Sequence, residues 1–129
     1  MTPTVGRLPV RLVLLRATCD NGRTCPNIKL TDRGTYLVQG YVVTAQYLGG
    51  HSLRPGEAMV EVPSSLLPEL AANQRGQRRV HRTAQGTLLV RGRLVVDVET
   101  LRALDLPAGE AAVEIPINGL PELELAYAR

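Results

Sequence analysis

The sequence contains no phenylalanine and no tryptophan, and only four of its 129 residues are tyrosine. Large aromatic side chains usually bury the most area in a small core, so leucine and valine must supply the packing here. The scarcity also bears on binding, because proteins that hold single-stranded nucleic acids stack bases on aromatic side chains. The composition therefore predicts an aliphatic core and disfavours a single-strand-binding protein.

Long apolar runs are missing as well. The longest one near the start, Leu12 to Leu15, is closed by Arg11 and Arg16. A membrane-spanning helix needs about 20 apolar residues, and a secretory signal needs a longer apolar region followed by a small-residue cleavage site. We therefore expect no membrane span and a cytoplasmic location.

Groups suited to catalysis are few. The two histidines are His51, which follows two glycines, and His81, which lies among arginines, and neither can be placed beside a partner acid or base. No glycine-rich loop of the kind that cradles phosphates is present. Four glutamates recur at strand positions and are interpreted as solvated residues: Glu57, Glu61, Glu110 and Glu114. We expect no enzymatic activity and no cofactor.

Only two cysteines are present, Cys19 and Cys25. Three states fit their spacing: a local disulfide, two free thiols, or two zinc ligands completed by His51 or His81. The spacing differs from the short Cys-x-x-Cys knuckle, and the second half of the chain has no cysteine. We therefore favour free thiols or a disulfide, and expect no metal.

What the chain does contain is a repeat. The stretch "PGEAMVEVPSSLLPEL" at residues 55–70 recurs as "AGEAAVEIPINGLPEL" at residues 108–123. From Gly56 and Gly109 onward, ten of fifteen positions are identical, where ordinary composition would give roughly one. Upstream, "GTYLVQGYVVTA" at 34–45 matches "GTLLVRGRLVVD" at 86–97.

We interpret this pattern as a tandem internal duplication of a unit that covers residues 26–70 (the first unit) and 78–123 (the second unit). A unit of about 45 residues is marginal for independent folding without a metal or disulfide. We therefore expect both units to form one shared small β-barrel-like core. The chain is then a single domain over residues 1–129, with an N-terminal strand over residues 8–18.

The expected fold class is mainly β with short helices. Residues 57–63 and 110–116 alternate charged and apolar side chains with a period of two, and each segment ends at proline. Gly40 and Gly92 lie in the middle of two further apolar segments, each predicted as one bent strand or two short strands.

Helix is predicted at two places only. Residues 97–106 can form two turns with Asp97 as N-cap. Residues 63–74 can form a longer helix, in which Pro68 is tolerable only within the first turn.

The second unit reads "GRLVVDVETLRALDLPAGEAAVEI" over residues 92–115. It resembles the swapped-hairpin DNA-binding domain of the AbrB transition-state regulators and related antitoxins. The matching residues are Gly92, Arg93, Leu94, Val95, Val96, Glu99, Leu101, Arg102, Leu104, Leu106, Gly109, Glu110, Val113, Glu114 and Ile115. This resemblance implies two short units that interlock into one small barrel, and a role in transcription regulation through DNA binding.

The whole chain also resembles small uncharacterised actinobacterial proteins. The stretches that carry the resemblance are "CPN" at 25–27, "TDRGT" at 31–35, "VQGY" at 38–41 and "GEAMVEVP" at 56–63. No activity follows from this resemblance.

Charge is unevenly distributed, although the net charge is only +3. Residues 75–93 contain no acid and six arginines: Arg75, Arg78, Arg79, Arg82, Arg91 and Arg93. Residues 97–124 contain seven acids and one base. Guanidinium groups suit phosphate oxygens, so the arginines are candidate contacts to double-stranded DNA. The alternative is a solvated basic segment that lies on the acidic strand of its own chain or of a neighbouring molecule.

Three tyrosines distinguish the first unit from the second. Tyr36, Tyr41 and Tyr47 stand where the second unit has leucine, arginine and glutamate. An exposed tyrosine face suits a protein partner, although semi-exposed strand tyrosines explain the pattern equally well. The sequence thus predicts a non-enzymatic regulatory protein that binds DNA through its arginines. The alternative is a protein–protein interaction module or a self-assembling, homo-oligomeric structural protein.

Overall fold

A computed structural model describes residues 11–19, 25–43, 53–67 and 79–116. These residues form seven β-strands, one α-helix and one 3-10 turn, so the fold is mainly β. The strands are β1 (Leu12–Ala17), β2 (Asn27–Thr31), β3 (Thr35–Val42), β4 (Glu57–Pro63), β5 (Val80–Arg82), β6 (Thr87–Leu94) and β7 (Glu110–Pro116). The helix is α2 (Val98–Leu104), and the turn η2 (Ser64–Leu66) follows β4. No helix within these ranges is long and apolar enough to cross a membrane.

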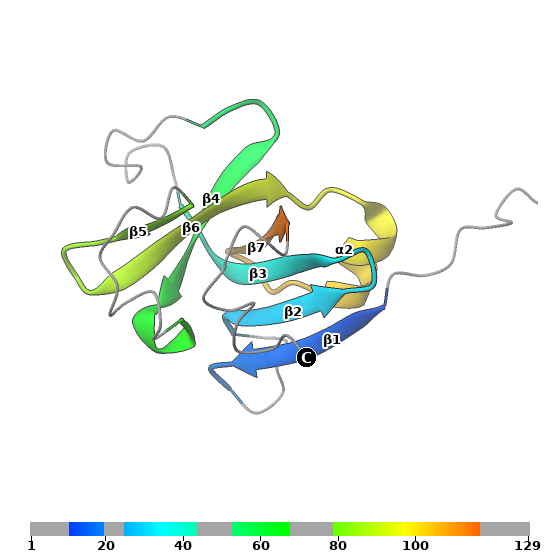
Figure 1. Cartoon of the computed structure of the whole chain (residues 1–129), viewed down its shortest axis with the longest axis horizontal. Coiled ribbons are helices and arrows are strands. Elements are labelled where there is room, and N and C mark those ends of the chain that lie inside the picture. Colours follow the sequence, from blue (N-terminus) through cyan, green and yellow to red (C-terminus); the bar gives the residue numbers. More distant parts are fainter. Residues whose placement is uncertain (1–10, 20–24, 44–52, 68–78, 117–129) are drawn as a thin grey trace, which may run out of the picture.

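All seven strands belong to one antiparallel sheet, and four of them close a ring: β3 pairs with β4 and β7, and β6 pairs with the same two strands. Figure 1 shows β1 and β2 beside β3, and β5 beside β6. The long pairings join the two units, because β3 pairs with β7 over seven residues and β4 pairs with β6 over seven residues. The longest strand pairing of each unit is therefore with a strand of the other unit.

Matching positions of the two units have matching partners on the paired strands. Gly40 lies opposite Ala111, and Gly92 lies opposite Ala58. A side chain at either glycine would collide with a neighbouring strand, since a Cβ on Gly40 would lie 2.6 Å from the Glu61 carbonyl oxygen. Each glycine lies within one continuous strand rather than between two, and lets the ring strands approach closely.

The core is aliphatic, as predicted, and draws on both units. Its main cluster contains Ile28, Tyr36, Val38, Val60, Val62, Leu66, Leu67, Val80, Leu88, Val90, Val113 and Ile115. Tyr36 is only 1% exposed. Its predicted place on a partner-binding surface is therefore wrong, because it points to the same side of β3 as the buried Val38.

A second, smaller cluster lies under α2. Leu104 of the helix packs with Leu37 of β3 and Ala112 of β7. The helix lies within the predicted range, and the Asp97 side chain caps it by accepting a hydrogen bond from the Thr100 backbone N–H at 2.9 Å. The helix predicted over 63–74 is described only as far as Leu67, where η2 is a single 3-10 turn.

The N-terminal strand is observed over Leu12–Ala17, at one edge of the sheet. A disulfide between Cys19 and Cys25 joins the end of this strand to the start of β2. Of the three cysteine states that the sequence left open, the structure therefore has the disulfide.

Candidate functional site: an arginine-lined cleft

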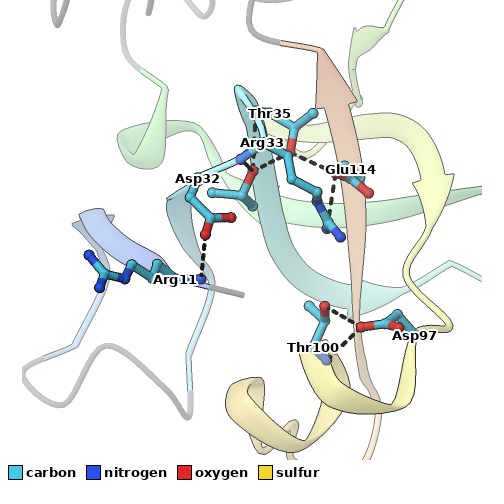
Figure 2. Close-up of polar contacts among 8 residues, drawn as sticks. Arg11, Asp32, Arg33, Thr35, Asp97, Thr100 and Glu114 are labelled. Carbon is cyan, nitrogen blue, oxygen red and sulfur yellow. Dashed lines mark hydrogen bonds and ion pairs between the residues drawn. The ribbon is translucent and has the colours of Figure 1, made fainter. Parts of the chain in front are cut away.

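One wall of the candidate site is built by the turn between β2 and β3. The Gly34 N–H donates to the Thr31 carbonyl oxygen at 3.3 Å, and Gly34 has a φ of 75°, which favours glycine. The Thr31 and Thr35 hydroxyls are 2.6 Å apart. This arrangement directs Thr35 and Arg33 toward β7, as Figure 2 shows.

Glu114 of β7 is the group they meet. Its carboxylate accepts a hydrogen bond from the Thr35 hydroxyl at 2.6 Å and one from the Arg33 guanidinium at 3.3 Å (Figure 2). The Glu114 side chain is 20% exposed and that of Arg33 is 47% exposed. Glu114 is thus a held and partly neutralised carboxylate at the rim of the cleft, rather than the freely solvated residue that the sequence predicted.

A second wall is the turn that leads into β4. The Glu57 N–H donates to the Arg54 carbonyl oxygen at 2.9 Å, and the Glu57 carboxylate accepts from the Arg54 N–H at 2.9 Å. The Gly56 carbonyl oxygen accepts from the Leu94 N–H of β6 at 2.8 Å. These bonds fix the position of the turn against the end of β6.

Between these walls lies an open cleft of about 470 Å³. It is lined by Thr35, Arg54, Pro55, Gly56, Glu57, Arg79, Arg93, Glu114 and Pro116. Arg93 occupies the central position in register, because it lies opposite Glu57 on β4 and opposite Glu114 on β7. The fold therefore brings three arginines together: Arg54 from the turn before β4, Arg79 from the position just before β5, and Arg93 from the end of β6.

Positive charge is in excess around the cleft. Arg54, Arg79 and Arg93 line it, and Arg33 reaches it through Glu114. Two carboxylates oppose these four guanidinium groups, and both already accept hydrogen bonds. No described residue forms an ion pair with Arg54, Arg79 or Arg93. The cleft can therefore attract an anion at little cost in existing contacts.

The matching region around the other end of the ring keeps the framework. The Thr87 hydroxyl donates to the Glu61 carboxylate, and the Thr83 and Thr87 hydroxyls are 2.7 Å apart. The arginines, however, are not repeated. The residues that match Arg33, Arg54, Arg79 and Arg93 are Gln85, Pro107, Asn27 and Tyr41. The shared framework therefore does not require the arginines.

Two residues of the first unit show what the framework does without arginine. Asn27 and Gln39, which correspond to Arg79 and Arg91, are buried and hydrogen-bonded to each other at 3.0 Å. The Lys29 ammonium donates to Asn27 at 2.6 Å, and Gln39 donates to the Glu110 carboxylate at 2.8 Å. In the first unit this position is a closed polar network rather than a cationic surface.

The predicted arginine cluster is brought together in part. Arg79 and Arg91 are opposite each other, since the Arg91 N–H donates to the Arg79 carbonyl oxygen at 2.7 Å. Arg93 lies two residues beyond Arg91, on the same side of β6. Arg82 is exposed at the end of β5 and points to the opposite side. Arg75 and Arg78 lie outside the described residues.

Sequence reasoning missed Arg33 and Arg54. Both are isolated in the sequence from the cluster at 75–93, so charge density along the chain did not reveal them. A position-by-position comparison of the two units does reveal them, because each arginine around the cleft has an uncharged counterpart. Of the other predicted contacts, Tyr41 is half-exposed on β3, and Tyr47 lies outside the described residues.

In the part of the chain that the structure describes, no group of three or more histidine, cysteine, aspartate or glutamate side chains could hold a metal ion. Comparison of the chain with known protein families, with curated proteins and with solved structures gave no match.

Proposed function

We propose that this protein is a non-enzymatic regulator that binds double-stranded DNA through phosphate contacts from Arg79, Arg91 and Arg93. The observation that carries the proposal is the position of these arginines. Arg79, just before β5, lies opposite Arg91 of β6, and Arg93 lies two residues further along β6. Their counterparts in the first unit are Asn27, Gln39 and Tyr41. Arginines that a fold does not need, on one side of a sheet, are suited to phosphate oxygens.

Duplex DNA is favoured over single strands by composition. The residues that line the cleft around Arg79 and Arg93 include no phenylalanine, tyrosine or tryptophan for base stacking. A guanidinium group can form two parallel hydrogen bonds to one phosphate, which gives contact without sequence readout. The protein would therefore bind DNA with a strong dependence on salt.

The proposal includes an origin for the asymmetry. We infer that a tandem duplication produced two units that close one small barrel-like core, and that only the second unit acquired the arginines. The exchange of β4 and β7 between the units supports this, because interlocked units are what the AbrB resemblance implies. A DNA-binding regulator of this kind acts in the cytoplasm.

The test is a fluorescence anisotropy titration of a labelled DNA duplex at several salt concentrations. The variant carries Arg79→Asn, Arg91→Gln and Arg93→Tyr, which are the residues that the first unit has at the matching positions. We expect weaker binding, and a salt slope that falls by about one for each lost phosphate contact. Arg102→Gln, an exposed charge change on α2, is the matched control and should leave affinity nearly unchanged.

Wild-type protein that does not bind duplex, or binds it independently of salt, would contradict the proposal. Light scattering on the same samples tests the alternative. If the triple variant loses self-association while DNA binding is negligible throughout, the arginines contact a second copy of the chain instead.

A further inference from the structure

We propose that the arginine-lined cleft is a binding site for a phosphomonoester, that is, a terminal phosphate group that carries two negative charges. The group could belong to a small phosphorylated molecule or to the phosphorylated end of a DNA strand. The inference rests on the proposed function only in that both use Arg79 and Arg93. It adds Arg33 and Arg54, which lie outside the proposed DNA surface, and it commits to one kind of phosphate.

Charge is the first argument. Three arginines and two glutamates line the cleft, and Arg33 pairs with one of those glutamates from beside it, which leaves a net charge of +2 for the whole group. A phosphomonoester carries about −1.5 to −2 at neutral pH, whereas each phosphodiester of a DNA backbone carries one negative charge. The excess charge therefore matches a terminal phosphate better than an internal one.

The two glutamates do not close the site against an anion. Glu57 is held by the N–H of Arg54, and Glu114 is held by Thr35 and Arg33. Arg93 lies between the two in register but forms no ion pair with either. Arg93 is thus a lining residue whose backbone lies between those of the two glutamates, and its guanidinium group is available to a ligand.

Size and shape are the second argument. The cleft of about 470 Å³ falls within the range of about 300–1,000 Å³ that is typical of small-molecule sites. Its arginines come from three different elements, so they can approach a phosphate from several sides. A flat row of arginines along one strand would instead suit successive phosphates of a backbone.

The matching region of the chain has the same framework without the arginines. There Gln85, Pro107, Asn27 and Tyr41 replace the arginines, while Thr87 and Glu61 keep the same hydrogen bond. The framework is therefore the same in both places, and only one of them has the charge to bind a dianion. Residues of the matching region therefore serve as an internal reference in a binding titration.

The experiment is an NMR chemical-shift titration of the full chain with methyl phosphate, which is a minimal phosphomonoester. Dimethyl phosphate, a minimal phosphodiester, is the matched probe with one charge. We expect saturable shifts at Gly56, Glu57, Arg93 and Glu114 with methyl phosphate, and at least tenfold weaker binding of dimethyl phosphate. Equal affinity for both probes, or no saturable shifts at the cleft, would overturn the proposal.

Variants separate this site from the proposed DNA surface. Arg54→Gln and Arg93→Tyr should each weaken methyl phosphate binding at least fivefold. Arg91→Gln, which removes an arginine outside the cleft, should change methyl phosphate affinity by less than twofold and still weaken duplex binding. Loss of methyl phosphate binding in Arg91→Gln but not in Arg54→Gln would place the anion elsewhere and sink the proposal.

Dependence on pH gives an independent readout. The second ionisation of a phosphomonoester has a pKa of about 6, so methyl phosphate should bind roughly tenfold more tightly at pH 7.5 than at pH 5. The charged groups that line the cleft are Arg54, Arg79, Arg93, Glu57 and Glu114, with Arg33 paired to Glu114 beside it. His81 of β5 lies two residues after Arg79, but it is not part of the lining and its Nε2 is buried. Sulfate remains a dianion over this range, so a sulfate titration reports protonation of the protein alone. A methyl phosphate profile that matches the sulfate profile would contradict selection of the dianion.

The source of the phosphate is distinguished by two duplexes, one with and one without 5′-phosphates. Tighter binding of the phosphorylated duplex assigns the site to DNA ends. Equal binding of the two duplexes, together with displacement of neither by methyl phosphate, assigns it to a small phosphorylated molecule. If no duplex binds but methyl phosphate does, the proposed function fails and this site stands.

Discussion

At the scale of single residues, two glycines and two threonines fix the geometry that the cleft depends on. Gly40 and Gly92 allow the ring strands to approach until a Cβ would lie within 3 Å of a backbone carbonyl oxygen. Thr35 and Thr87 then tie Glu114 and Glu61 across the strands. These residues recur in both units, whereas the arginines do not, so structure and charge are carried by different positions.

Gly40→Ala and Gly92→Ala should each lower the free energy of unfolding by about 1–3 kcal/mol, the usual cost of overpacking. The added Cβ would meet the Glu61 carbonyl oxygen at 2.6 Å or the Glu114 carbonyl oxygen at 2.8 Å. Urea denaturation measures the change. Gly86→Ala is the control for backbone strain without crowding, because Gly86 has a φ of 84° and nothing lies within 4 Å of an added Cβ.

Asparagine tolerates a positive φ, so Gly86→Asn should be milder than Gly86→Ala. Asparagine at position 40 should bring no such relief, because the obstacle there is space. Full stability of Gly40→Ala would contradict the close approach of β3 and β4 at Gly40.

Thr87→Val should lower the free energy of unfolding by about 1–2 kcal/mol, because it removes a hydrogen bond to a partly buried carboxylate. Valine keeps the shape and the strand propensity of threonine, so the change isolates the hydroxyl. Thr35→Val, at the matching position opposite Glu114, should cost a similar amount. Thermal unfolding of the two variants checks this, and unchanged midpoints in both would exclude a structural role for the pair.

At the scale of elements, α2 and the two turns decide where the charged residues lie. The helix follows β6 and packs on Leu37 of β3, which belongs to the first unit, and on Ala112 of β7, which belongs to the second. The turns at 31–35 and 54–57 carry Arg33 and Arg54 to the cleft. A substitution at the end of α2 should therefore lower the stability of the protein while every arginine of the cleft stays in place.

Asp97→Ala tests this for α2. The Asp97 carboxylate accepts from the Thr100 N–H at 2.9 Å and from its hydroxyl at 2.8 Å. Loss of this cap should lower the free energy of unfolding by about 1 kcal/mol, as measured by chemical denaturation. Asp97→Asn should retain most of the stability, and methyl phosphate binding should stay unchanged in both variants. A loss in Asp97→Asn equal to that in Asp97→Ala would argue against capping.

At the scale of the whole molecule, the ring makes the two units dependent on each other. β3 finds its main partner in β7, and β4 finds its main partner in β6. The core contains side chains of both units, including Val38 and Val60 from the first and Val90 and Val113 from the second. A fragment that contains one unit therefore lacks both its long pairings and half of its core.

A fragment of residues 1–74 should not fold, because β3 and β4 would expose their pairing edges and their apolar sides to water. Its amide NMR spectrum should show poor dispersion. Addition of a fragment of residues 75–129 should restore dispersion, because it supplies β6 and β7 as the missing partners. A dispersed spectrum of the first fragment as a monomer would contradict the interdependence of the units.

Much of the local structure could be predicted from the sequence. Alternation of charged and apolar residues predicted the strands at 57–63 and 110–116, and Asp97 predicted the start of the helix. β2 and β5 were not predicted, because they are short and their alternation is brief. The disulfide remained one of three open states, since spacing alone does not bring two sulfur atoms together.

The candidate site was harder to predict than the strands. The sequence indicated Arg79 and Arg93, because they belong to a dense run of arginines, but it gave no reason to add Arg33 or Arg54. Those two come close to the others only when β3 pairs with β7 and β4 pairs with β6, and both of these pairings are non-local and join the two units. Likewise, alternation places Tyr36 and Val38 on one side of β3 without telling which side is the interior of the ring.

The sequence by itself determined an aliphatic, mainly β chain with a repeated pattern and an asymmetry of charge, because composition and short-range periodicity carry that information directly. Only the tertiary structure decided that β3 pairs with β7 and β4 with β6, that Tyr36 is buried, and that three distant arginines line one cleft with Arg33 beside it. The physical reason is that strand pairing depends on contacts between residues tens of positions apart, and those contacts follow from burying both units in one core rather than from any local preference.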